Sequence, residues 1–178
     1  MTSDALTQRV AAAARRVSRL EDLAAIADLH RDYVRRLAER DWDGMIENFM
    51  PDAVVSLRNH GIRRGRAEIA DLFSAMHSAG SPPDAYLLTS PHIEVSGDDA
   101  SGWWTWQRHF SELPVMGGGL RIAGPWWEGR YRTRYRKEAG RWRFAEMWFR
   151  LIAPHRDPDA DDVIGPGWTT LEEDGGQV

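Results

Sequence analysis

The sequence of 178 residues places its helical patterns first and its long strand patterns last. Apolar residues recur at helical spacing in the N-terminal part, whereas residue types alternate along the stretches that follow Pro83. Segregation of this kind is typical of an α+β domain with an antiparallel sheet, and the sheet must curl around the helices to bury both apolar faces. The predicted strands are 52–58, 86–95, 102–113, 126–137 and 141–152.

Three helices are predicted ahead of the long strands. Ser18 and Glu21 form a capping box, which predicts that the first helix begins at Ser18. Asp41 is predicted to cap a short second helix that ends near Met50, because a proline follows. A third helix is predicted after the Gly61–Gly65 turn, with Ile69, Leu72, Phe73 and Met76 on its apolar face.

The same patterns divide the chain into one domain and two flanking segments. Residues 18–153 form the predicted domain, a size that one hydrophobic core serves well. Residues 1–17 are rich in Ala and Arg and are compatible with either a short basic helix or a frayed arm. Residues 154–178 are rich in Pro, Gly and Asp and are predicted to be a tail.

Composition argues against several function classes. The net charge is −4 and the basic residues are scattered, so a nucleic-acid partner is not expected. The absence of cysteine excludes disulfides, Cys-ligated metal and a thiol nucleophile. No apolar run approaches the ~20 residues of a membrane span, so we expect a cytoplasmic location. The histidines lack ligand spacing and no phosphate loop is present, so neither metal nor cofactor is expected.

Nine tryptophans are the unusual feature of the composition. Tryptophan is large and must place its N–H group, so a surplus indicates a big core, an interface or a site for an aromatic ligand.

Four segments of the chain resemble SnoaL-like members of the nuclear transport factor 2-like superfamily. The first, 26–54, contains Ile-Ala-Asp-Leu-His-Arg-Asp-Tyr and Phe-Met-Pro-Asp-Ala-Val-Val; the others are 64–69, 93–100 and 129–144. The resemblance spans about residues 20–152 and implies a cone-shaped α+β barrel with an aromatic-lined pocket for a small molecule. Because this fold hosts enzymes, binding proteins and structural subunits, the resemblance predicts the fold more specifically than the function.

The resemblance is nearest to the branch of scytalone dehydratase, bile-acid 7α-dehydratase and hexachlorocyclohexane dehydrochlorinase. It implies a cofactor-free lyase and a homo-oligomer, with a trimer favoured and a dimer as the alternative. This branch typically uses an Asp late in the first helix and a His at the start of the strand after the third helix as general base. The corresponding positions are Ala38 and Tyr86, or Glu39 for the first if the register moves by one, so a variant chemistry is expected.

Two residues on the apolar stripe of the first helix are candidates for the site. The resemblance places Tyr33 at a position often used for a pocket Tyr or Lys, where a phenol can donate to an oxyanion; the alternative is a core tyrosine. His30 lies on the same stripe and either titrates in the pocket or fills space at its edge. Tyr86 is expected to face the pocket and to bind or orient a phenolic substrate.

The strand 102–113 presents two faces, and the sequence leaves open which one is inside. Trp104, Trp106, Arg108 and Phe110 share one face, and Trp103, Thr105, Gln107 and His109 share the other. If the second face is inside, His109 is the best general-base candidate. If the first is inside, Arg108 is the inward cation for an anionic substrate.

The last two predicted strands supply the remaining candidates. Tyr131, Thr133 and Tyr135 are predicted to form an inward row, and the arginines that alternate with them a solvated row. Strict alternation places Glu146 on one face with Trp142, Phe144, Trp148 and Arg150, where it is either an acid–base group or an ion-pair partner of Arg150 or of an arginine on the neighbouring strand. Arg58 and His60 are predicted to lie near the entrance.

Together these features favour a cofactor-independent lyase that moves protons on a hydroxylated aromatic or polycyclic molecule. Water elimination and retro-aldol loss of a small carbonyl such as formaldehyde are the two reactions considered. An isomerase or cyclase for a polyketide-like substrate is one alternative. The other is a non-catalytic subunit resembling the β subunits of ring-hydroxylating dioxygenases, in which the tryptophans would be interfacial.

Overall fold

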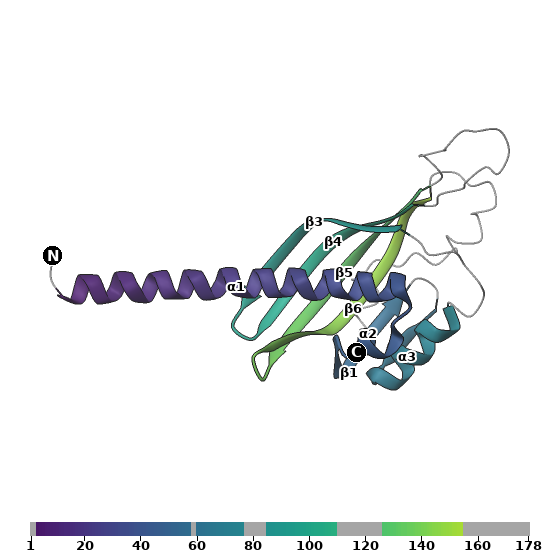
Figure 1. Cartoon of the computed structure of the whole chain (residues 1–178), viewed down its shortest axis with the longest axis horizontal. Helices are drawn as coiled ribbons and strands as arrows, with labels where there is room; N and C mark the ends of the chain where they lie inside the picture. The colour runs from purple at the N-terminus through teal and green to yellow at the C-terminus, as the bar shows by residue number, and fades with distance from the viewer. Residues whose placement is uncertain (1–2, 58–59, 77–84, 110–125, 155–178) are drawn as a thin grey trace.

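A computed structural model describes residues 3–57, 60–76, 85–109 and 126–154 of the chain (Figure 1). A long helix, α1 (Ser3–Glu39), leads into the short α2 (Trp42–Ile46) and the strand β1 (Phe49–Leu57). The remaining elements are β2 (Ile62–Arg64), α3 (Gly65–Met76), β3 (Ala85–Ser96), β4 (Asp99–His109), β5 (Trp126–Glu138) and β6 (Arg141–Pro154).

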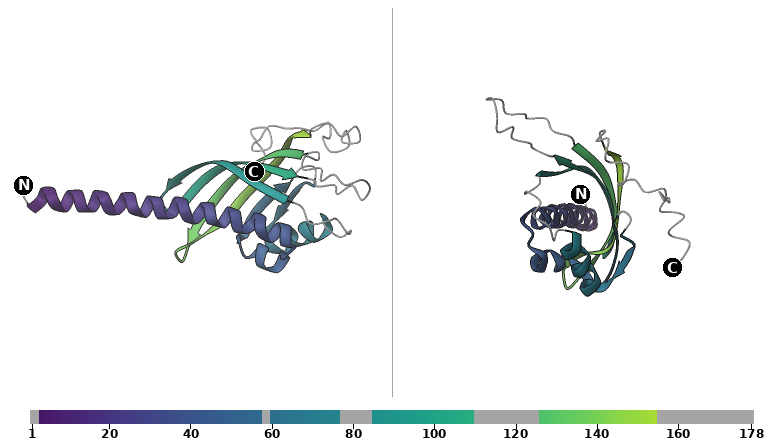
Figure 2. Two further views of the ribbon diagram at one scale, coloured as in Figure 1. Left: turned by 45° about the horizontal axis from the view of Figure 1, so that its top comes forward. Right: turned by 90° about the vertical axis from the view of Figure 1, so that its right-hand side faces the viewer.

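The described strands form one sheet in the order β2-β1-β6-β5-β4-β3. Neighbouring strands are antiparallel except β1 and β6, which are parallel. The sheet curves around the C-terminal half of α1, and α2 and α3 lie at the end where α1 stops (Figures 1 and 2). The predicted α+β architecture is confirmed, with a mixed rather than wholly antiparallel sheet, because β1 joins the edge of the meander alongside the last strand.

Helix α1 begins well before the residue predicted to start it. It is continuous from Ser3 to Glu39, so Ser18 and Glu21 lie inside the helix and the predicted capping box does not form there. The reason is composition: residues 11–14 are four alanines, the best helix formers, and no glycine or proline interrupts the run. Of the two structures considered for the N-terminal segment, the helix is the one observed from Ser3 onward.

The second helix is shorter than predicted. Asp41 caps α2 as expected, with its Oδ1 atom accepting a hydrogen bond of 3.0 Å from the backbone N–H of Gly44. Phe49 and Met50, which the sequence places at the end of the helix, belong to β1 instead, as does Pro51. The pairing of β1 with β6 shifts register between Phe49 and Val54, so Pro51 lies at an irregularity where its missing N–H breaks no regular ladder.

A β-bulge in β6 changes which side chains face the core. Tyr135 pairs with Phe144 and Arg134 pairs with Glu146, so Ala145 has no counterpart on β5. Alternation therefore inverts at this point. The buried residues of β6 are Trp142 and Phe144 before the bulge and Met147, Phe149 and Leu151 after it.

Candidate functional site

The inner face of β4 is the face that carries Trp104 and Trp106. Each of these side chains is 3% exposed, whereas Trp103 is 46% exposed on the opposite face. Arg108 shares the inner alternation and lies half-buried with its Cζ 5.4 Å from the centre of the Trp127 ring. The condition under which His109 would be the general base, with the other face inside, is therefore not met; its side chain lies outside the described residues.

The buried His30 of α1 lies at the centre of a polar cluster on the inner side of the sheet. His30 is fully buried, and its Nδ1 atom lies 3.1 Å from the hydroxyl of Tyr135. The same hydroxyl accepts a hydrogen bond of 2.8 Å from the Trp104 indole N–H. Burial lowers the pKa of His30 to about 3, so the imidazole is neutral at physiological pH. Among the described residues, the Nε2 atom of His30 has no hydrogen-bond partner.

A glycine gives the Tyr135 side chain its position. Tyr135 is buried on the inner face of β5, and a Cβ atom at Gly102 would lie 2.8 Å from its ring. Thr133 lies beside it and donates a hydrogen bond of 3.0 Å to the carbonyl of Gly102. Burial raises the pKa of Tyr135 far above its usual value, so the phenol stays protonated and can donate. The predicted inward row of Tyr131, Thr133 and Tyr135 is confirmed.

Aromatic rings connect His30 to the edge of the domain. The centroid of the His30 ring lies 4.9 Å from that of Tyr131, which lies 4.6 Å from Phe149. Phe149 contacts Trp106 at 5.1 Å, and Trp106 stacks on Tyr86 at 5.5 Å. These five contacting rings form a continuous wall, which we call the aromatic row, along the inner face of the sheet.

Tyr33 is part of the core beside this row. It is 1% exposed and its ring packs edge-on against Phe49, Tyr131 and Phe144. This packing is what the core alternative for Tyr33 anticipated. A chemical role for Tyr33 stays a prediction.

The outer end of the aromatic row forms one wall of a cleft between α1 and β3. The cleft has a volume of about 290 Å³, and Tyr86 and Ala38 both line it. These are the two positions at which the resemblance places the general-base pair, so the fold brings the positions together although neither carries a base. Its other lining residues are Arg31, Val34, Arg35, Leu87 and Leu88.

Sequence reasoning did not identify the contribution of Arg31 and Arg35 to this cleft. Arg31, Arg35 and Ala38 follow at intervals of four and three residues, so they lie on one side of the helix. This spacing indicates that the three residues share one side of the helix. It does not by itself predict that a strand will lie opposite that side.

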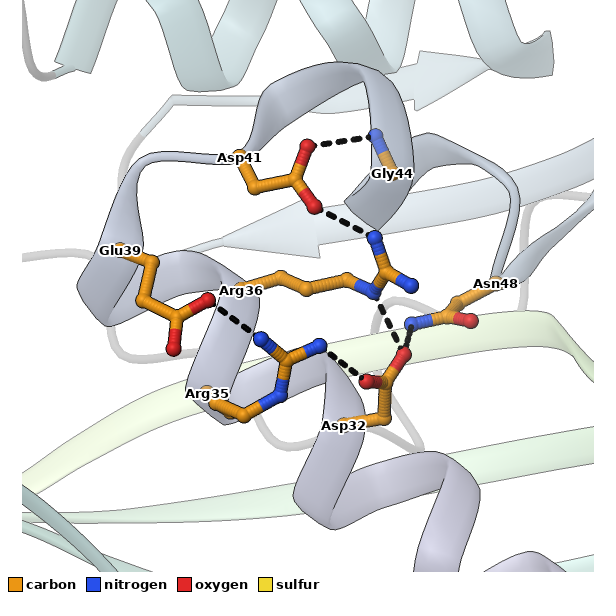
Figure 3. A network of polar contacts seen from close by, with 7 residues as sticks. All are labelled: Asp32, Arg35, Arg36, Glu39, Asp41, Gly44 and Asn48. Carbon is orange, nitrogen blue, oxygen red and sulfur yellow. Dashed lines mark hydrogen bonds and ion pairs between the residues drawn. The ribbon is translucent and has the colours of Figure 1, made fainter.

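A polar network fixes the end of α1 that borders the cleft (Figure 3). Asp32 accepts hydrogen bonds from Arg35 at 2.7 Å, Arg36 at 2.6 Å and the buried Asn48 at 3.0 Å. Partial burial raises the pKa of Asp32, but the bonds from Arg35, Asn48 and Arg36 outweigh it and lower the pKa to about 2. Arg35 also bonds to Glu39, and Arg36 to the α2 cap, Asp41. The network holds the Arg35 guanidinium at the cleft.

Glu146 and Trp148 lie on the outer face of the sheet, contrary to the strict alternation. The bulge at Ala145 turns them outward, where Glu146 lies 3.7 Å from Arg134 of β5 and accepts a hydrogen bond of 3.4 Å from the Trp148 indole. The ion pair with a neighbouring strand, one of the alternatives considered for Glu146, is the arrangement observed. The outer face also carries a shallow groove of about 800 Å³ whose lining includes Trp103, Arg132, Arg134 and Glu146.

The two residues predicted at the entrance give little support to the site. Arg58 lies outside the described residues. His60 is exposed in a bend after β1, where its backbone N–H donates to the carbonyl of Leu57 at 3.0 Å.

Within the described residues, no group of three or more His, Cys, Asp or Glu side chains is arranged to hold a metal ion. The helices in the same ranges include none that is both long and apolar enough to cross a membrane.

Solved structures with this fold include enzymes and a protein of unknown function. A type 2 hexachlorocyclohexane dehydrochlorinase is 20% identical, with a TM-score of 0.65 over 79% of this chain and 93% of that one. A scytalone dehydratase-like protein from Novosphingobium aromaticivorans is 16% identical, with a TM-score of 0.64 over 78% and 89%. A Mycobacterium tuberculosis protein of unknown function is 21% identical, with a TM-score of 0.64 over 83% and 85%.

At these identities the structural likeness establishes the fold alone. No curated protein matches the sequence. The family model of the SnoaL-like domain matches residues 18–148, which is most of the chain. The chain therefore belongs to the SnoaL-like family of the nuclear transport factor 2-like superfamily.

Proposed function

We propose that this chain is a cofactor-independent lyase for a hydroxylated aromatic or polycyclic small molecule, which binds in the cleft between α1 and β3. The observation that carries the proposal is the double role of Tyr86, which lines the cleft and also forms the outer end of the aromatic row. A flat ring that enters beside Ala38 would meet an aromatic surface and a phenol together. The cleft volume of about 290 Å³ is near the lower end of ordinary small-molecule sites and suits one or two rings.

The charges at the cleft suit an anionic oxygen. Arg31 and Arg35 line it; Arg31 is paired with Asp28, and Arg35 is paired with both Asp32 and Glu39. These pairs reduce the net charge but leave guanidinium N–H groups to donate. A substrate phenolate would gain hydrogen bonds at this rim while its ring packs against Tyr86.

The described residues that line the cleft include no carboxylate and no imidazole, so we propose that the substrate itself supplies the driving force. In an elimination, electrons of the substrate phenolate move into the ring as the bond to a benzylic hydroxyl breaks, and the departing hydroxide takes a proton to form water. Tyr86 is the phenol placed to give that proton. In a retro-aldol loss of formaldehyde from the keto tautomer of the ring, the hydroxymethyl group gives its O–H proton to solvent as its C=O bond forms. The broken C–C bond leaves its electrons on the ring oxygen, and the same cations stabilise that oxyanion.

The buried residues behind the cleft are proposed to support its aromatic wall rather than to carry protons. Trp106 supports Tyr86 by stacking, and Tyr131 continues the row to His30. His30 stays neutral and is proposed to set the position of Tyr135 and Trp104 through its hydrogen bond. Tyr33, Thr133 and Arg108 remain proposed contributors, and none of these three is among the described residues that line the cleft.

The experiment is a screen of hydroxylated aromatics, including hydroxybenzyl alcohols, with binding measured by calorimetry and products by NMR. Tyr86→Phe should lower kcat by 10- to 100-fold if the phenol donates a proton, with little change in binding. Ala38→Trp should abolish binding because the indole fills the cleft. Ala25→Trp, the same change at an exposed position of α1, is the matched control and should bind like the wild type.

A non-catalytic role is the second candidate, favoured by the tryptophans of the outer face. Trp103 is 46% exposed and Trp148 half-buried beside the outer groove, an arrangement that suits contact with another subunit. Binding without turnover across the whole screen would support this candidate, whereas conversion to a rearranged product without loss of atoms would favour the isomerase alternative.

A further inference from the structure

The N-terminal part of α1 extends beyond the sheet (Figures 1 and 2). This part of the helix carries exposed apolar side chains. Asp22 of α1 bonds to the sheet, with its Oδ1 atom 2.7 Å from the Nζ atom of Lys137 and 2.8 Å from the Trp142 indole nitrogen. Ahead of it, the helix exposes four large apolar side chains. Leu6, Val10, Val17 and Leu20 are 54%, 61%, 53% and 64% exposed, respectively.

These side chains follow a heptad pattern. With the exposed Ala13, the apolar positions are separated by four, three, four and three residues, which defines one seam along the helix, here called the arm seam: Leu6, Val10, Ala13, Val17 and Leu20. Counting ~100° per residue, this seam lies roughly 150° away from the stripe of Ile26, His30 and Tyr33 that packs on the sheet. The apolar surface of the arm therefore faces away from the chain's own core.

We propose that the arm seam pairs with the arm seam of a second copy of this chain as a parallel two-stranded coiled coil. Val10 and Val17 occupy the a positions, and Leu6 and Leu20 occupy d positions, and β-branched residues at a with Leu at d favour parallel pairs. Arg16 at g then faces Glu21 at e of the other copy, an attractive pair. An antiparallel pairing would instead bring the g residues Arg9 and Arg16 of the two copies together.

A second copy fits this surface better than a lipid bilayer does. Helices that lie in a membrane interface normally insert Trp or Phe, yet none of the nine tryptophans precedes residue 42 and the first aromatic residue is Tyr33. The seam spans only two heptads, about 22 Å, so the association should be weak. The helix is already continued by its packed half, which removes the nucleation cost that a free peptide of this length would face.

Disulfide trapping tests the pairing and its direction, because the full chain contains no cysteine. Leu6→Cys should form a covalent dimer under mild oxidation at tens of micromolar protein, since parallel pairing brings position 6 next to its equivalent. Ala11→Cys, on the opposite side of the same exposed helix, should stay at least 10-fold less crosslinked. Equal crosslinking of the two variants, or none in either, would overturn the proposal.

Sedimentation gives an independent readout that works even if the folded domain also self-associates. The double variant Val10→Glu, Val17→Glu should lower the assembly mass twofold relative to the wild type, whereas Arg15→Glu on the polar side should not. Arg16→Glu should also weaken the assembly, and adding Glu21→Arg should restore it. An unchanged mass in the double variant, or a monomeric wild type that binds phosphatidylserine vesicles through these residues, would contradict the pairing.

Discussion

The two faces of the sheet use the same residue types for different purposes. On the inner face, Trp104 and Tyr135 are buried, hydrogen-bonded to each other and packed around a neutral His30. On the outer face, Trp103 is exposed beneath the guanidinium of Arg132, at 5.1 Å, and Glu146 pairs with Arg134. The inner face excludes charge and fixes each polar atom, whereas the outer face keeps its charges solvated. Trp103 and Trp104 are adjacent in the sequence, yet they are expected to contribute unequally to stability.

The largest difference between the faces should appear at neighbouring residues of β4. Gly102→Val should destabilise the chain by about 3–5 kcal/mol or prevent folding, because the new side chain meets the Tyr135 ring and Thr133 in a close-packed interior. Ser101→Val, one residue away on the outer face, should change the free energy of unfolding by about 0.5 kcal/mol or less. Urea denaturation of both variants measures this, and similar losses would show that the two faces are not distinct.

Removal of one oxygen tests the inner hydrogen bonds. Tyr135→Phe should cost about 2 kcal/mol, because it leaves the Trp104 indole N–H without its acceptor and deprives the Nδ1 atom of His30 of its partner. Tyr86→Phe, at the partly exposed cleft, should cost much less. Urea denaturation measures the free energy of unfolding of both variants. A Tyr135→Phe variant as stable as the wild type would show that these inner hydrogen bonds do not stabilise the fold.

The buried histidine should make stability depend on pH. Its pKa is about 3 in the folded chain, below the ordinary 6.5, so below pH 6.5 only the unfolded state takes up the proton. Stability that is fully present above pH 6.5 should fall by about 1.4 kcal/mol per pH unit as the pH is lowered toward 3.

His30→Phe is the control, because it removes this contribution while the carboxylates remain. The difference in unfolding free energy between wild type and variant should change with that slope between pH 6.5 and 5. A constant difference, or an imidazole NMR signal from His30 that titrates near pH 6.5, would mean that the side chain is not buried as described.

The smallest effect is expected on the outer face. Glu146→Gln removes the ion pair with Arg134, whose side chain is 68% exposed, and should change stability by about 0.5 kcal/mol or less. Turnover should be unaffected as well. A 10-fold loss of activity in this variant would return Glu146 to the site and contradict the separation of the two faces.

Sequence patterns predicted the architecture and the inward row of β5, because long stretches of alternating residues leave one choice of face once the core is defined. They failed at Ala145, where one extra residue inverts the alternation and moves Glu146 outward, since a bulge leaves no signal in periodicity. They also failed at Ser18, where a favourable capping pattern competes with a better continuous helix.

The cleft was only half predictable for a related reason. The resemblance gave Tyr86 and Ala38 as the positions of the general-base pair, and both line the cleft. The contributions of Arg31 and Arg35 depend on how α1 is held by the Asp32 network, and such long-range side-chain contacts cannot be counted from spacing.

The central claim is that a small aromatic molecule binds between α1 and β3, on the inner side of the sheet. The most direct measurement is calorimetric titration of the hydroxylated aromatic that binds best in the screen into the wild type, Ala38→Trp and Ala25→Trp. The account predicts saturable binding to the wild type and Ala25→Trp, and at least a 100-fold loss of affinity in Ala38→Trp. Unchanged affinity in Ala38→Trp, together with loss of binding when Trp103 of the outer face is replaced by alanine, would contradict it.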